Sequence, residues 1–203
     1  LDLKTPRVAV LGTDCCIGKR TTASLLTEHL RAEGVKAEMI STGQTGYLQG
    51  TPHGFFFDAT PNDFVSGELE RVTLECVRAS TPELIIFEGQ SSFFNPSGPC
   101  GAEFILSGGA RHVILQHAPK REFHDDLEHL RARIPPPEKH IAMAELLGAT
   151  VLAVSINEEG MTRDEAVAER DRLQDTLKLP VVLPLQDGVG ELAQLVKQQV
   201  LVG

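Results

Sequence analysis

The feature that most constrains the fold lies near the start of the chain, where an apolar run leads into a glycine-bounded turn and a lysine. Residues 8–11 form the run, Gly12 and Gly18 bound the turn, and Lys19 opens an amphipathic segment. This order predicts a β-strand, a loop with inward-facing backbone N–H groups, and a helix whose N-terminus adds partial positive charge. We interpret it as a phosphate-binding loop with Lys19 as its mobile cation. The alternative is a plain strand-to-helix turn with an exposed lysine.

The loop departs from the standard motif G-x-x-x-x-G-K-[ST] at two points. Five residues rather than four separate Gly12 from Gly18, and Arg20 takes the place of the hydroxyl that holds Mg²⁺ in the standard loop. Thr21 or Thr22 is the alternative hydroxyl donor, unless the ligand needs no tightly held metal. The residues that we predict to bind a cofactor here are Gly12, Thr13, Asp14, Cys15, Gly18, Lys19, Arg20, Thr21 and Thr22.

Length and charge bound the class of protein. The chain has 203 residues, of which 41% are hydrophobic, so we expect one domain over residues 1–203 with a proper core. The net charge of -9 argues against a nucleic-acid partner, because neutralising phosphates requires a basic face. No apolar run approaches the ~18 residues of a membrane span, and no basic-then-apolar leader is present. We therefore expect a cytoplasmic protein that acts on a small molecule and not at a membrane.

The four cysteines form no C-x-x-C pair and have no zinc-ligand spacing with histidine. Cys76 falls on an apolar helical stripe and is predicted to be a core residue. Cys15 and Cys16 precede a helix N-terminus beside two cations, where a thiolate is favoured. They are either candidate nucleophiles or small side chains that fit the loop.

Apolar runs alternate with helical patterns along the rest of the chain. Runs at 35–41, 84–88, 111–116, 151–156 and 180–184 predict buried strands, and the patterns at 19–32, 138–147 and 191–201 predict helices. A further helix carries the stripe Val65, Leu69, Val72 and Cys76, with Thr60 as its predicted cap. The alternation predicts an α/β fold, a three-layer sandwich around a mostly parallel, doubly wound sheet.

Polar residues follow two of the predicted strands at the edge where such sheets bind ligands. Gly43, Gln44 and Thr45 follow the strand 35–41 and are candidate substrate contacts, or else ordinary turn residues. Glu88 ends the strand 84–88, where phosphate-loop proteins hold Mg²⁺ or its water opposite the loop. Gln90 and Ser91 then open a long polar segment that is predicted to bind substrate.

The strands 111–116 and 151–156 end in further candidates. His117 follows the first, with Lys120 and Arg121 beside it, and these groups either meet an anionic ligand or are a polar cap and solvated cations. Asn157 follows the second, where an amide can recognise a purine edge or simply serve a turn. His124 and His129 are five residues apart, do not share a helix face, and are predicted to lie on a wet helix surface.

Several motifs in order resemble known families. The pattern Gly-Thr-Asp-x-x-x-Gly-Lys at 12–19 resembles dethiobiotin synthetase and its relatives, a P-loop branch of ATP-dependent ligases with a P-loop NTPase-like fold. Together with the segments 42–46, 63–67 and 88–91 and with Asp58, it resembles one bacterial and archaeal family. That family was long described as a domain of unknown function and is now associated with D-glutamate N-acetyltransferase.

The second resemblance implies acetyl transfer from acetyl-CoA to the amine of D-glutamate. A phosphate loop can hold the phosphates of coenzyme A without hydrolysis, so Arg20 in place of the Mg²⁺ ligand is tolerated. Glu88 or His117 would be the base, loop amides would stabilise the oxyanion, and Arg20, Lys120 or Arg121 would hold the substrate carboxylates. The resemblance also implies that the chain is the C-terminal half of a longer protein, behind a Rossmann-like N-terminal domain absent here, and we expect a homo-oligomer.

Two other functions stay open at this point. An ATP-dependent ligase or kinase would use Lys19 on the phosphates, Asp58 and Glu88 on Mg²⁺, and Asn157 on adenine. A non-catalytic nucleotide-binding or oligomerisation module would need its missing partner domain. Arg20 disfavours a tight Mg²⁺ site whereas Glu88 favours one, so these two residues do not decide between ATP and acetyl-CoA.

Overall fold

Seven parallel strands form one sheet in the computed structural model, which describes residues 3–201. They are β1 (Arg7–Gly12), β2 (Ala37–Ser41), β3 (His53–Gly54), β4 (Leu84–Glu88), β5 (His112–His117), β6 (Thr150–Ile156) and β7 (Val181–Val182). The order across the sheet is β3-β2-β4-β1-β5-β6-β7, and every neighbouring pair is parallel. The most apolar runs of the sequence thus become the central strands, where both faces are covered.

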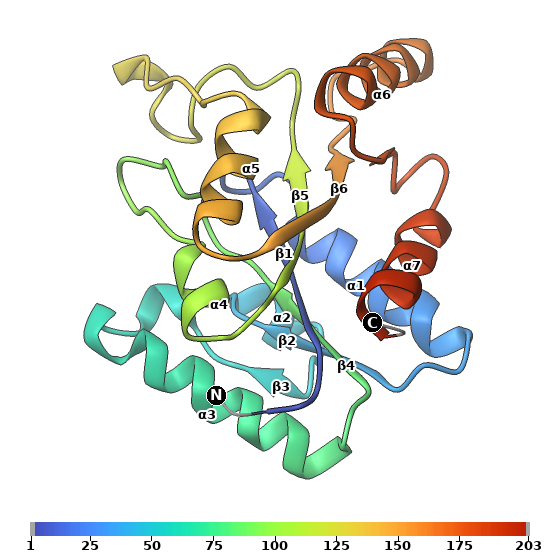
Figure 1. Cartoon of the computed structure of the whole chain (residues 1–203). Helices are drawn as coiled ribbons and strands as arrows, with labels where there is room; N and C mark the ends of the chain where they lie inside the picture. The colour runs from blue at the N-terminus through green and yellow to red at the C-terminus, as the bar shows by residue number, and fades with distance from the viewer. Residues whose placement is uncertain (1–2, 202–203) are drawn as a thin grey trace.

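Helices connect the strands and cover both faces of the sheet. The α-helices are α1 (Lys19–Ala32), α2 (Gln44–Leu48), α3 (Asn62–Ser80), α4 (Ala102–Leu106), α5 (Pro137–Leu146), α6 (Arg163–Leu177) and α7 (Gly190–Val196). Two short 3₁₀ turns are η1 (Phe57–Ala59) and η2 (Glu128–Leu130), and a π-helical segment η3 (Lys197–Leu201) continues α7. In Figure 1, α1 and α7 lie to the right of β1, whereas α3, α4 and α5 lie to its left.

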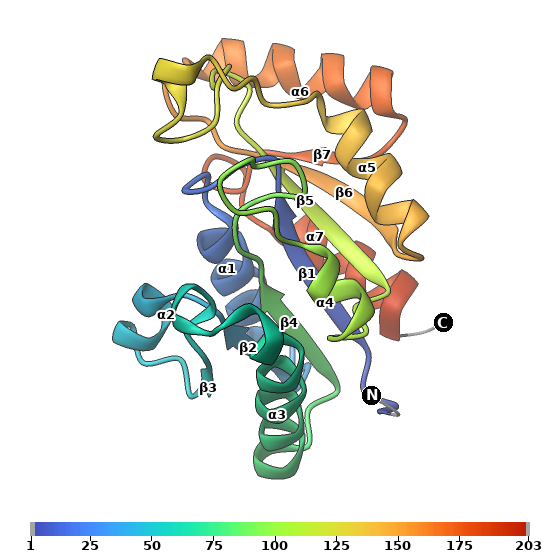
Figure 2. The same ribbon diagram turned by 90° about the vertical axis from the view of Figure 1, so that its left-hand side faces the viewer.

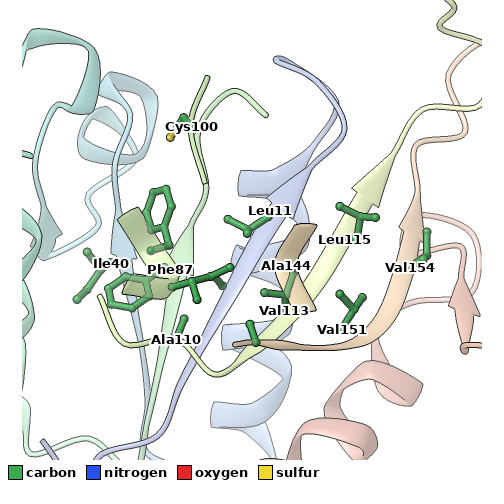
Figure 3. Packing of buried hydrophobic residues seen from close by; sticks show 14 of the residues in the cluster. Leu11, Ile40, Phe87, Cys100, Ala110, Val113, Leu115, Ala144, Val151 and Val154 are labelled. Atoms are coloured by element: carbon green, nitrogen blue, oxygen red, sulfur yellow. The ribbon is translucent and has the colours of Figure 1, made fainter. Parts of the chain in front are cut away.

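Alternate side chains of β1 belong to two hydrophobic cores, one on each face of the sheet. Val8 and Val10 point to the face covered by α1 and α7, and Ala9 and Leu11 point to the face covered by α3, α4, α5 and α6. Figure 3 shows Leu11 on the second face, with Leu115 of β5 and Ala144 of α5 in the same cluster. This arrangement confirms the predicted three-layer sandwich. Figure 2 shows the same layers after a quarter turn.

Side-chain capping differs between α6 and α3. Thr162 and Glu165 form a reciprocal capping box at the start of α6. Thr60, however, does not cap α3, so this prediction is wrong. Its hydroxyl donates to the carbonyl oxygen of Phe56 at 2.8 Å, and Pro61 occupies the N-cap position. None of the helices within residues 3–201 combines the length and the apolar composition that a membrane span requires.

Candidate functional site

A cleft of about 860 Å³ opens at the carboxyl ends of the central strands. Its walls come from the loop after β1, the start of α2, the end of β4 and the segment that follows it. The predicted site residues that line it are Cys15, Gly18, Lys19, Arg20, Thr21, Thr22, Gly43, Gln44, Thr45, Asp58, Glu88, Gln90, Ser91 and Asn157. The sheet therefore gathers segments far apart in sequence around one cavity, as expected for the carboxyl edge of a parallel sheet.

The phosphate-binding loop presents unpaired backbone donors. Cys16 and Gly18 have positive φ angles of 52° and 100°, which turn the chain tightly before α1. The backbone N–H groups of residues 16–18 take part in none of the hydrogen bonds found within residues 3–201. Since these residues line the cleft at the N-terminus of α1, the loop offers free donors and a partial positive charge to an anion.

Lys19 bridges the loop to the opposite wall. Its ammonium donates to the carbonyl oxygens of Asp14 at 2.5 Å and Ser91 at 3.0 Å. Only 6% of the residue is exposed, and this burial lowers the pKa of the amine, against the opposing effects of Cys15 and Asp14. The side chain lies over Gly12, where an added Cβ would meet the Lys19 Cδ at 2.9 Å. Gly12 does not line the cleft, and its absence of a side chain makes room for the lysine.

Asp14 is buried beneath the loop and does not line the cleft. Its carboxylate accepts hydrogen bonds from the Nδ1 of His124 at 2.8 Å, the backbone N–H of Asp125 at 2.9 Å and Arg121 at 3.1 Å, with Asn95 at 3.4 Å. Burial alone would raise the pKa of Asp14, but these donors together lower it below its ordinary value. Asp14 thus anchors the loop to the segment after β5.

The burial of His124 contradicts one sequence prediction, and the ion pairs of two cations bear on a second prediction. His124 is 1% exposed and lies outside any helix, so its placement on a wet helix surface is wrong. Arg121 is engaged by Asp14 and Lys120 pairs with Glu165 at 2.9 Å, so neither cation is free to meet an anionic ligand in this structure.

Thr13 and His117 also lie behind the loop. The hydroxyl of Thr13 is 3.0 Å from the Nδ1 of His117, and its backbone N–H donates to the carbonyl oxygen of Gln116 at 3.0 Å. Burial lowers the pKa of His117 to about 4. His117 does not line the cleft, so its imidazole is not placed to act as the base on a ligand bound there.

Glu88 lies in the cleft at the end of β4, although only 4% of the residue is exposed. Its carboxylate accepts from the backbone N–H of Thr42 at 3.1 Å, and the Thr42 hydroxyl donates to the Glu88 carbonyl oxygen at 2.6 Å. Burial raises the pKa of Glu88, opposed by the Thr42 amide and by the charge of Arg20. A carboxyl group with a raised pKa in a cleft is a candidate for proton transfer.

Thr22 and Asn157, two other predicted ligand contacts, form hydrogen bonds within the protein. The Thr22 hydroxyl donates to the Gln116 Oε1 at 2.7 Å. The Asn157 amide donates to the carbonyl oxygen of Ile17 at 3.1 Å and accepts from the backbone N–H of Glu159 at 2.8 Å. One donor and one acceptor position of the Asn157 amide are therefore used within the protein, and one of each remains for the predicted purine contact.

The thiol of Cys16 is not activated. Cys16 is exposed, yet partial burial and the neighbouring Asp125 raise its pKa, so the prediction of a stabilised thiolate is wrong for this residue. The Cys15 thiol lies 3.6 Å from the Ser91 hydroxyl and accepts from Asn95 at 3.5 Å. The Cys15 side chain thus lies between the loop and the segment after β4.

The cleft suits a phosphate group better than a magnesium ion held in the standard way. Arg20 occupies the position of the usual hydroxyl ligand, and the Thr22 hydroxyl is bound to Gln116. Asp58 and Glu88 both line the cleft, but residues 3–201 contain no group of three His, Cys, Asp or Glu side chains placed to hold a metal.

The family of the chain follows from comparison with known proteins. The model of the domain of unknown function described as "DUF1611_C, P-loop domain" matches residues 1–193. The chain belongs to this family. A DUF1611 family protein from Anabaena variabilis has a solved structure with a TM-score of 0.88, at 23% identity over 97% of this chain and 58% of that one. The fold and the phosphate-binding loop are thus those of the DUF1611 P-loop domain.

A curated relative of this DUF1611 domain carries a functional name. The protein from Tritonibacter scottomollicae named D-glutamate N-acetyltransferase is 31% identical over 195 residues, which cover 92% of this chain and 56% of the relative. The chain thus spans little more than half of the relative's length. Cobyrinic acid a,c-diamide synthase from Mycobacterium smegmatis, solved with ADP and magnesium, has a TM-score of 0.53 at 13% identity over 88% of this chain and 85% of that one. The similarity to the cobyrinic acid a,c-diamide synthase shows the fold alone.

Sequence reasoning missed several residues of the site. Gln116 lines the cleft and binds Thr22, and its position at the end of a buried strand was a signal that could have identified it. Ser97 and Gly98 also line the cleft, and Asn95 reaches the buried Asp14. They come from an irregular segment without a periodic pattern, so no signal in the sequence placed them.

Proposed function

We propose that this chain is the donor-binding half of an enzyme that transfers the acetyl group of acetyl-CoA to the amine of D-glutamate. The observation that carries the proposal is the cleft in which free backbone donors of residues 16–18 face the same cavity as the buried Glu88. The curated name of the Tritonibacter relative supports the choice of reaction. Because the chain spans 56% of that relative, we further propose that an additional domain completes the enzyme.

The loop would bind the phosphates of coenzyme A. Three unpaired N–H groups, the N-terminus of α1 and the Lys19 ammonium converge there, and none of these groups requires a metal to bind an anion. Lys19 would exchange its bond to the Ser91 carbonyl for a phosphate oxygen. Acetyl-CoA supplies the activated acetyl thioester when it is bound.

Glu88 would accept the proton that the acceptor must lose. The ammonium group of D-glutamate first gives one proton to the Glu88 carboxylate, and the neutral nitrogen then forms a bond to the thioester carbonyl carbon. The carbon–sulfur bond breaks, and the nitrogen's second proton goes to the departing thiolate, so the products are an amide, a free thiol and one proton on Glu88. Its raised pKa makes Glu88 a better base than an exposed carboxylate.

Mass spectrometry of a mixture of the chain, acetyl-CoA and D-glutamate tests this proposal. We expect N-acetyl-D-glutamate and free coenzyme A in equal amounts, and at least 10²-fold slower formation with Glu88→Gln. Glu70→Gln, on the exposed side of α3, is the matched control and should keep the wild-type rate. Absence of product from the wild-type chain, both alone and within the longer protein, would contradict the proposal, as would full activity of Glu88→Gln.

A second candidate function is ATP-dependent activation of a carboxylate. The observation in its favour is the pair of carboxylates, Asp58 and Glu88, in the wall of a cleft that also contains the loop. Carboxylate oxygens are the ligands that Mg²⁺ prefers. Formation of ADP that depends on both Mg²⁺ and a carboxylate substrate would support this function over acetyl transfer.

A further inference from the structure

Arg20 stands between two cavities. Besides the main cleft, a smaller cavity of about 410 Å³ lies between the outer face of α1 and residues 49–52. Arg20 and Thr21 line both cavities, whereas Glu88 and Lys19 line the main cleft only. A side chain at this border can contact a ligand in either cavity and can hold two ligands next to each other.

Among the described residues, the guanidinium of Arg20 has no partner. Within residues 3–201 it takes part in none of the side-chain hydrogen bonds or ion pairs, although the residue is partly buried. Arg31, the other cation of the smaller cavity, is bound to the Glu38 carboxylate at 2.6 Å and to the Ala37 carbonyl oxygen at 2.7 Å. Of the three cations predicted to hold the substrate carboxylates, Lys120 and Arg121 also form ion pairs. Arg20 is therefore the one left to bind an anion.

The charges around Arg20 favour an anion on its side of the cleft. The charge of Arg20 opposes the rise that burial causes in the pKa of Glu88, and both residues line the main cleft. Glu28 also lines the smaller cavity but is eight positions along α1, roughly 12 Å from Arg20 by helical rise. The repulsive carboxylate is thus at the far end of the cavity.

We propose that Arg20 binds a carboxylate of the amino-acid acceptor, which occupies the smaller cavity while the acetyl donor occupies the main cleft. The proposal rests on the proposed function for the presence of such an acceptor. A planar guanidinium binds a carboxylate through two parallel hydrogen bonds, which a lysine cannot reproduce. The volume of about 410 Å³ falls within the range of small-molecule sites. At the position where the standard loop has a metal ligand, this site would bind an anion. An arginine suits that role.

Calorimetric titration of the chain, first saturated with coenzyme A as an unreactive donor, tests the proposal. The titrants are D-glutamate, L-glutamate, D-aspartate and D-glutamine. We expect Arg20→Gln to raise the Kd for D-glutamate at least tenfold and to leave the Kd for coenzyme A within threefold, and Arg20→Lys to recover only part of the loss. Arg78→Gln is the matched control, since Arg78 is an exposed arginine on α3 that lines neither cavity.

Each other result overturns the proposal or separates it from the proposed function. Unchanged D-glutamate affinity in Arg20→Gln overturns it, and so does binding of no carboxylate by the wild-type chain. Weaker coenzyme A binding with D-glutamate unaffected also overturns it, because Arg20 would then hold a donor phosphate. If Arg20→Gln acetylates D-glutamate at the wild-type rate, the Arg20 proposal is overturned and the proposed function stands. If another acid among the titrants binds in an Arg20-dependent way and D-glutamate does not, the Arg20 proposal stands and that acid is the acceptor.

Discussion

The Asp14 carboxylate and the Nδ1 of His124 lie 2.8 Å apart, and both side chains are sealed from solvent. The pair joins the phosphate-binding loop to a segment 110 residues further along the chain. Arg121 and the backbone of Asp125 add two more donors to the same carboxylate. The loop is therefore positioned by a buried charge network and not only by its own glycines.

Removal of the Asp14 carboxylate should destabilise the fold. In Asp14→Ala, the buried His124 and the partly buried Arg121 lose their acceptor, and we expect the free energy of unfolding to fall by about 3 kcal/mol. Urea denaturation measures this change. Glu70→Ala removes an exposed carboxylate on α3 and should change stability by less than about 0.5 kcal/mol. Equal stability of the two variants would show that the network contributes nothing.

Acidification should destabilise the protein through two buried histidines. Burial lowers the pKa of His117 to about 4 and that of His140 to about 3. Both are then neutral in the folded state, whereas the unfolded state binds protons below its pKa of about 6.5. The stability from these two residues is complete above pH 6.5 and declines as the pH falls towards the folded pKa values.

Urea denaturation between pH 7 and pH 5 measures this effect. Each histidine should cost about 2 kcal/mol at pH 5, from 1.5 pH units at about 1.4 kcal/mol per unit. His140→Phe removes one of the two groups, and the ring has aromatic neighbours in Phe93 and Phe94. The variant should lose about half of the pH dependence. A slope that is the same with and without His140 would contradict the account.

Two glycine-to-alanine changes in helices should act in opposite directions. A Cβ at Gly46 in α2 would lie 2.4 Å from the Ser41 Cβ, so Gly46→Ala should destabilise the protein by roughly 1–3 kcal/mol. A Cβ at Gly67 in α3 meets nothing within 4 Å, so Gly67→Ala should stabilise it by about 0.5–1 kcal/mol. Thermal denaturation of both variants checks the signs, and a gain in Tm for Gly46→Ala would refute the close packing.

The sequence predicted the fold better than the site. Apolar runs such as 84–88 are strong local signals, and the buried strands and the loop after β1 follow from them. The roles of Asp14 and His124 depend on a contact between distant segments, which no local pattern encodes. The same holds for Lys120 and Arg121, whose partners, Glu165 and Asp14, lie far away in sequence. Lining residues at strand ends were predictable, whereas the division between cleft-facing and buried groups was not.

Calorimetric titration of the chain with acetyl-CoA and with ATP, each in Mg²⁺ and in EDTA, tests the central claim most directly. The account predicts that acetyl-CoA binds with the same affinity in both buffers, and that Lys19→Ala weakens this binding at least tenfold because a buried ammonium at the loop is lost. Binding of ATP only with Mg²⁺, with no binding of acetyl-CoA, would contradict the account and identify a phosphoryl-transfer site.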